Sequence, residues 1–175
     1  TFVLEPYVVE GGGTVIFAPP GAGKSYLCMA MAASIAAGVS EPWAVSQRPC
    51  LYINIERSRQ SLGVREQAIR RALGITGPTN VSYLHGRGAS LRTLAGRIRE
   101  HTREHKNSII FLDSISRSGL GDLNSNETAN ALVDLMNTLS TTWVGIAHTP
   151  RITADHAYGS VHLDAGQDIG VKLLS

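Results

Sequence analysis

The chain has 175 residues, of which 43% are hydrophobic and 17% are charged, and its formal net charge is +2. This length and balance predict one globular domain with a core of its own, and the small net charge gives little support for a nucleic-acid partner. No apolar run approaches the roughly 18 residues that a membrane span needs, and no signal peptide is recognisable. The two cysteines, Cys28 and Cys50, are expected to be small buried hydrophobic residues of a reducing compartment. We therefore expect a cytoplasmic protein with no membrane partner.

The elements predicted by hydrophobic periodicity alternate between strands and helices along the chain. A partly extended lead-in over residues 2–9 and three glycines precede the first core strand. Strands are expected at residues 14–17, 50–55, 81–84, 108–112, 143–147 and 168–174, and helices at residues 26–37, 58–73, 91–105 and 127–139, the last of them capped by Asn124. This alternation predicts an α/β fold in which helices cover both faces of a parallel sheet.

The most specific motif lies between the first core strand and the first helix and reads Ala18-Pro19-Pro20-Gly21-Ala22-Gly23-Lys24-Ser25. Gly21 and Gly23 let the backbone turn so that its N–H groups converge on an anion, and the start of the helix adds free N–H groups. Lys24 would place its ammonium on the β- and γ-phosphates of a nucleotide, and Ser25 would offer its hydroxyl to Mg²⁺. A glycine-rich turn without a ligand is the alternative, and Ala18 stands where the strict pattern has glycine. The motif favours a nucleoside triphosphate site made of Ala18, Pro19, Pro20, Gly21, Ala22, Gly23, Lys24, Ser25 and Tyr26.

Further polar residues fall where strands of the predicted sheet end. Parallel sheets bind ligands beyond the carboxyl ends of their strands, and the sequence places Glu56, Asp113 and His148 there, together with the glycine-rich loop. Asp113 suits the Walker B role, in which a carboxylate helps to hold Mg²⁺, although it could instead cap the next element. Because Ser114 follows it, the second carboxylate of many ATPases is missing. We assign Glu56 as the general base that activates water; pairing with Arg57 or capping the next helix are the alternatives.

These motifs resemble the RecA-like ATPases, and within them the RepA-like group of plasmid hexameric replicative helicases and related phage ATPases; the KaiC and DnaB types are more distant. The resemblance rests on residues 18–25, 50–58, 109–117 with 124–126, 145–149, 159–160 and 164–168. It implies a single RecA-like ATPase domain over residues 1–175, which we expect to be a fragment with incomplete C-terminal strands. It also implies that the strand of the catalytic glutamate lies next to the strand that precedes the glycine-rich loop.

The same resemblance gives His148 a catalytic role, at a sensor position that contacts the γ-phosphate. Two histidines are common at that position, and here Ala147 replaces the first; a histidine that only ends a strand is the alternative. Proteins of this group complete the ATP site with a basic residue of the neighbouring subunit, which is expected near or beyond Lys172, with Arg151 as a further candidate. The resemblance therefore implies a homo-oligomeric ring, expected to be a hexamer.

Two functions stay open at this stage. The leading one is an ATP- and Mg²⁺-dependent ATPase that couples hydrolysis to translocation on, or remodelling of, single-stranded DNA, as a replicative helicase does. In RecA-like rings the loops at residues 114–125 and 149–160 contact DNA, but here they hold few basic residues and, of the aromatic residues, only Tyr158. The alternative is a nucleotide-switched assembly or regulatory ATPase that acts on protein partners. His101 and His105, four residues apart, favour a solvated helix face over a metal site.

Overall fold

The computed structural model describes residues 1–149, 163 and 165–174. Its centre is a six-stranded sheet in the order β5-β4-β6-β7-β3-β8, in which every neighbouring pair is parallel. The strands of this sheet are β3 (Gly13–Ala18), β4 (Cys50–Asn54), β5 (Val81–His85), β6 (Ile109–Asp113), β7 (Trp143–His148) and β8 (Ile169–Lys172). The helices are α1 (Lys24–Ala37), α2 (Arg59–Ala72), α3 (Leu91–Glu104) and α4 (Asn126–Leu139). A separate antiparallel pair, β1 (Phe2–Leu4) and β2 (Val8–Val9), precedes the sheet.

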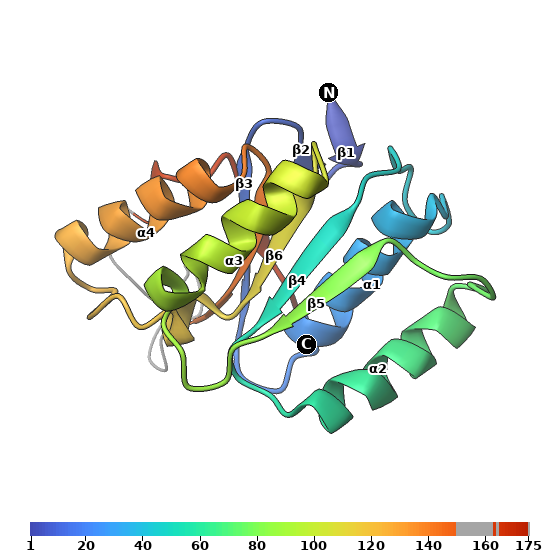
Figure 1. The fold of residues 1–175 in the computed structure, drawn as a ribbon, viewed down its shortest axis with the longest axis horizontal. Helices are drawn as coiled ribbons and strands as arrows, with labels where there is room; N and C mark the ends of the chain where they lie inside the picture. The colour runs from blue at the N-terminus through green and yellow to red at the C-terminus, as the bar shows by residue number, and fades with distance from the viewer. Residues whose placement is uncertain (150–162, 164, 175) are drawn as a thin grey trace.

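Helices cover both faces of the sheet (Figure 1). On one face, α1 and α2 bury their apolar side chains in a cluster with strand residues that include Ile16 and Phe111. On the other face, α3 and α4 share a second cluster with Val15 and Ile110. Neighbouring residues of a strand point to opposite faces, so the continuous apolar strands supply both clusters. The predicted α/β fold is confirmed.

Every predicted strand and helix is present, and the ends differ from the predicted ones by no more than two residues. The predicted cap of α4 is wrong. Because α4 begins at Asn126, the capping position falls on Ser125, whose Oγ accepts a hydrogen bond from the Thr128 N–H at 3.4 Å. Asn124 instead donates its main-chain N–H and its side-chain amide to Asp122. The loop after β6, expected to be polar, begins with a short 3-10 helix, η1 (Ile115–Arg117), whose first side chain is buried.

The strand order corrects a second expectation, because β4 does not lie next to β3. β6 and β7 stand between these strands, and β3 pairs with β7 on one side and β8 on the other. Glu56 nevertheless reaches the edge that holds the glycine-rich loop, since parallel strands all end at the same edge of a sheet. The Ile55 N–H donates to the Asp113 carbonyl at 2.9 Å, which keeps the two carboxylates on adjacent segments.

Three smaller expectations concern the membrane, the cysteines and the histidine pair. No helix in the described residues has both the length and the apolar character that crossing a membrane requires. Cys28 and Cys50 are buried and free, as expected. The rings of His101 and His105 lie with their centres 4.5 Å apart, and the described residues contain no cluster of three or more side chains suited to hold a metal.

Candidate functional site

The loop between β3 and α1 forms a backbone cradle. Gly21 and Gly23 have φ angles of +86° and +87°, a region that favours glycine, and no atom lies within 4 Å of the position that a Cβ would take in either residue. α1 follows directly with Gly23 as its N-cap residue, and among the described residues no side chain caps its first N–H groups. The open loop and the uncapped helix start leave several N–H groups available to an anion.

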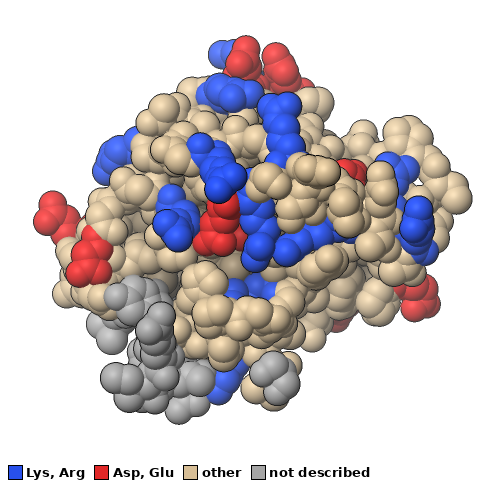
Figure 2. Space-filling view, turned by 90° about the horizontal axis from the view of Figure 1, so that it is seen from below, with Lys and Arg blue, Asp and Glu red and all other residues tan. Residues whose placement is uncertain are grey.

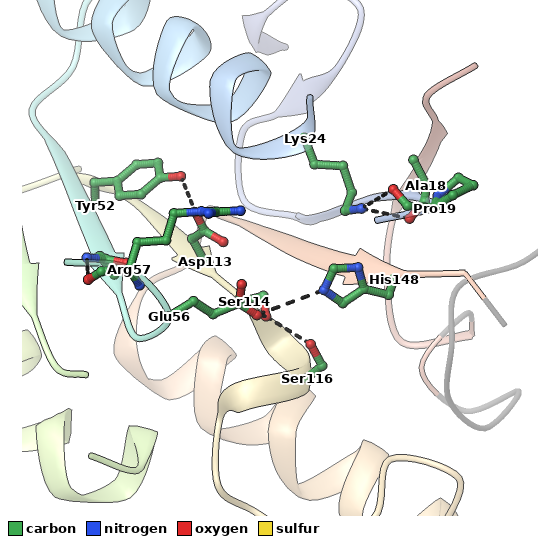
Figure 3. Close-up of polar contacts among 11 residues, drawn as sticks. Ala18, Pro19, Lys24, Tyr52, Glu56, Arg57, Asp113, Ser114, Ser116 and His148 are labelled. Atoms are coloured by element: carbon green, nitrogen blue, oxygen red, sulfur yellow. Dashed lines mark hydrogen bonds and ion pairs between the residues drawn. The ribbon is translucent and has the colours of Figure 1, made fainter. Parts of the chain in front are cut away.

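Lys24 is buried in this cradle, with 5% of its surface exposed. Its Nζ donates hydrogen bonds to the carbonyl oxygens of Ala18 and Pro19, at 2.7 and 2.8 Å (Figure 3). Burial lowers the pKa of Lys24, while the negative charges of Glu56 and Asp113 oppose that change. The ammonium is therefore held by two neutral carbonyl groups, which the oxygens of a phosphate can replace.

Asp113, at the end of β6, is 1% exposed. Tyr52 of the adjacent strand β4 donates its hydroxyl to Oδ2 of Asp113 at 2.9 Å. Burial raises the pKa of Asp113, and hydrogen bonds from Ser25 and Tyr52 oppose this rise because they favour the charged form. The Ser25 hydroxyl and the Asp113 carboxylate thus lie together, and hard oxygen donors of this kind suit Mg²⁺. This pair fits a divalent cation that is bound together with phosphates.

Glu56 lies two residues beyond β4 and is held by two side chains (Figure 3). Ser114 donates its hydroxyl to Oε1 of Glu56, and Nε2 of His148 lies 3.9 Å from the same oxygen. The contact with His148 and the Ser114 hydrogen bond outweigh the effect of burial and lower the pKa of Glu56 to about 2. The Glu56 side chain is 19% exposed. It therefore presents an ionised carboxylate to the neighbouring cavity at neutral pH.

A cavity of about 130 Å³ brings the predicted site residues together. Its walls include eight of them: Gly21, Gly23, Lys24, Ser25, Tyr26, Glu56, Asp113 and His148. Ala18 and Pro19 supply the carbonyls that hold Lys24, and Pro20 and Ala22 are not among the residues that line the cavity. Lys172 ends β8 and does not line it either. Arg151, Tyr158 and the loop at residues 150–160 lie outside the described residues.

Sequence reasoning missed the residues that orient these groups. Tyr52 and Ser114 are the hydrogen-bond partners of the two carboxylates, and Arg57 and Arg65 join the cavity wall. Asn54, which is fully buried, binds the main chain of Arg57 on both sides: Nδ2 donates to the carbonyl at 2.7 Å and Oδ1 accepts from the N–H at 2.9 Å. The available signal was a tyrosine and an asparagine within an apolar strand, because buried polar groups need partners.

The Arg65 guanidinium lies 4.7 Å from the centre of the Tyr26 ring, within reach of a cation–π contact. Tyr26 is largely exposed and Arg65 is half-buried. This contact joins α2 to the first turn of α1 at the rim of the cavity.

Comparisons with known proteins agree with this architecture. The family model described as "AAA domain" matches residues 2–151. Among solved structures, the ATPase domain of a DnaB-like replicative helicase superposes with a TM-score of 0.71 at 12% sequence identity, covering 95% of this chain and 71% of that chain. No curated protein matches the chain significantly. The structural likeness supports the predicted RecA-like P-loop ATPase fold, which is thereby confirmed. Since the family model spans most of the sequence, the chain belongs to the AAA domain family.

Proposed function

We propose that the chain is the catalytic domain of an oligomeric ATPase, which hydrolyses ATP with Mg²⁺ and couples hydrolysis to movement on single-stranded DNA. The observation that carries the proposal is the convergence of Lys24, Ser25, Glu56, Asp113 and His148 on one cavity. These residues come from four separate segments of the chain, and each has the chemistry for one part of phosphoryl transfer. A glycine-rich turn with no ligand would give no reason for two carboxylates to gather beside it.

Binding of the triphosphate is assigned to the loop after β3. Lys24 exchanges the carbonyl oxygens of Ala18 and Pro19 for oxygens of the β- and γ-phosphates, so the ammonium stays paired throughout. Ser25 and Asp113 would hold Mg²⁺, which compensates phosphate charge when it is bound. The Tyr52 hydroxyl keeps the Asp113 carboxylate in place for that role.

Activation of water is assigned to Glu56. With a pKa of about 2 the carboxylate is ionised, and it can accept a hydrogen bond from a water molecule and orient it toward the γ-phosphate. A carboxylate this weakly basic takes the proton only late, which suits a loose transition state in which the new bond is little formed. Ser114 and His148 fix the Oε1 atom, so we assign Oε2 to the water and His148 to the γ-phosphate sensor.

The oligomer and DNA parts of the proposal are supported by the resemblance to RecA-like ATPases. In a ring, a basic residue of one copy would reach the cavity of the next copy and stabilise charge on the transferred phosphoryl group. Lys172 and Arg151 are the candidates that this chain offers.

The experiment is ATP turnover by the full-length protein, with and without single-stranded DNA, at low and moderate salt. Stimulation by DNA that weakens as salt rises is the expected result, because contacts to phosphates release counterions. Slow turnover that ignores DNA but rises with protein concentration would replace the DNA-coupled role with a nucleotide-switched assembly role. A protein that binds no ATP would overturn both.

A further inference from the structure

A second and larger hollow, of about 680 Å³, lies beside the nucleotide cavity. The segments that follow β4, β5 and β6 form its walls at the carboxyl edge of the sheet. The residues that matter for its chemistry are Glu56, Arg57, Arg87, Ser90, Ser116 and Arg117. None of the proposed nucleotide chemistry uses Arg87 or Arg117, so the hollow requires its own explanation.

The hollow is strongly basic. Arg57, Arg87 and Arg117 come from three different segments and are all exposed. Among the described residues, no carboxylate lies within 4 Å of any of these three guanidinium groups. Glu56 is the one acidic residue in the described wall, and Ser114 and His148 already hold its Oε1 atom. Figure 2 looks onto this edge from below and shows Lys and Arg side chains gathered around a single acidic group.

The shape and the side chains of the hollow select an extended phosphate-bearing ligand. Guanidinium groups match phosphate oxygens in pairs, and unpaired arginines around one concavity attract anions. The volume of the hollow is many times the roughly 30 Å³ that one water molecule takes in the liquid, so one phosphate would fill only part of it. No aromatic side chain is among its described lining residues, so contacts to a backbone are favoured over the stacking of bases.

We propose that this hollow binds the phosphodiester backbone of single-stranded nucleic acid through Arg87 and Arg117. The inference rests on the proposed coupling of ATP hydrolysis to single-stranded DNA and names the surface that makes the contact. The backbone runs past the segments after β5 and β6, and its bases face away from the protein. Binding there depends on salt and not on base sequence.

The same surface is connected to the nucleotide cavity. Glu56 and Arg57 line both concavities and form the wall between them. A hydrogen-bonded series also joins the two: the Ser116 hydroxyl lies 2.9 Å from the Ser114 hydroxyl, which donates to Glu56. A phosphate placed against Ser116 and Arg117 therefore changes the field at the carboxylate that orients water. Occupation of the hollow is expected to change the rate of ATP turnover.

The test measures binding of a fluorescent oligothymidylate of about 20 nucleotides, a length that exceeds common site sizes, to the full-length protein. The variant is Arg87→Ala with Arg117→Ala, and the matched control is Arg92→Ala with Arg99→Ala, two exposed arginines of α3 that do not line the hollow. We expect the first pair to weaken binding at least tenfold. The slope of log affinity against log salt should shrink by about 1.4, because each lost phosphate contact removes about 0.7 for a single strand. The control pair should change neither quantity by comparable amounts.

Further arms separate the possible outcomes. Affinity for a fluorescent ATP analogue, measured on both double variants, should equal that of the unaltered protein. If no variant or parent binds the analogue, the proposed ATPase function fails; if all bind it but both double variants hold oligothymidylate equally, only the hollow is wrong. Oligouridylate should bind much as oligothymidylate does, since the contact is to the backbone. Displacement of the oligonucleotide by polyglutamate at equal charge concentration would instead indicate an acidic protein partner and overturn the inference.

Discussion

The glycine-rich loop and the carboxylate pair lie on opposite walls of one cavity, but they are built in different ways. The contacts of the loop are local: Lys24 binds carbonyls five and six residues before it. The carboxylates depend on distant partners: Tyr52 and Asp113 are 61 residues apart, and Glu56 and Ser114 are 58 residues apart. One wall is made by backbone conformation and the other by packing of strands.

This difference separates what each wall can lose. A change in the loop removes the place where phosphates bind, while the fold stays intact because the loop contacts little else. A change among the carboxylates leaves the phosphate cradle in place and alters chemistry or stability. The following predictions test that separation, from the largest expected effect to the smallest.

Replacing Lys24 should have the largest effect on ATP. Lys24→Ala removes the only side chain of the loop that carries a positive charge, so nucleotide affinity and turnover should each fall at least about a hundredfold. The free energy of unfolding should change little, because the buried ammonium is itself costly to desolvate. The measurements are binding of a fluorescent ATP analogue, ATP turnover and urea unfolding, with the exposed Lys106→Ala as the control. Normal ATP affinity in Lys24→Ala would remove the loop from the proposed site.

Replacing Glu56 should separate binding from chemistry. Glu56→Gln keeps the shape of the side chain but cannot polarise water as a carboxylate does, so turnover should fall by about 10² to 10⁴. Affinity for the ATP analogue should stay within a few-fold of the parent, since Glu56 holds no phosphate. Glu100→Gln, an exposed glutamate of α3, is the matched control for turnover. Unchanged turnover in Glu56→Gln would exclude Glu56 as the base.

Replacing Tyr52 should report on stability. Tyr52→Phe removes the hydroxyl that binds Asp113 and leaves a buried carboxylate oxygen without that donor. The free energy of unfolding at neutral pH should fall by about 1–3 kcal/mol, as expected for a buried charged group that loses a partner. Urea unfolding measures this loss. Tyr83→Phe, on the neighbouring edge strand β5, is the control, and an equal loss there would deny the hydroxyl any special role.

The smallest effect should be the dependence of stability on pH. The pKa of Glu56 is about 2 in the folded chain against a model value of 4.5, so folding favours the ionised form. The stabilisation is therefore complete above about pH 4.5 and is lost as the pH falls toward about 2. The difference in unfolding free energy between the parent and Glu56→Gln should shrink over that interval. A difference that stays constant with pH would contradict the proposed contacts of Glu56 with His148 and Ser114.

The sequence by itself determined the succession of strands and helices and the residues that end each strand. Apolar runs of five or six residues, separated by amphipathic helices, leave a parallel sheet as the stable arrangement. Parallel strands end at one edge, so the glycine-rich loop, Glu56, Asp113 and His148 were expected there before any contact was known. The conformation of the loop was also foreseeable, because Gly21 and Gly23 act within their own short segment.

Only the tertiary structure decided how those strand ends are arranged. Strand order places β6 and β7 between β4 and β3, because it depends on how helices pack across both faces rather than on any single segment. The partners of the carboxylates, Tyr52 and Ser114, follow from that order. So does the grouping of Arg57, Arg87 and Arg117 around one hollow, since each arginine follows a different strand. Local patterns specify elements, whereas contacts between residues far apart in sequence arise only when those elements pack.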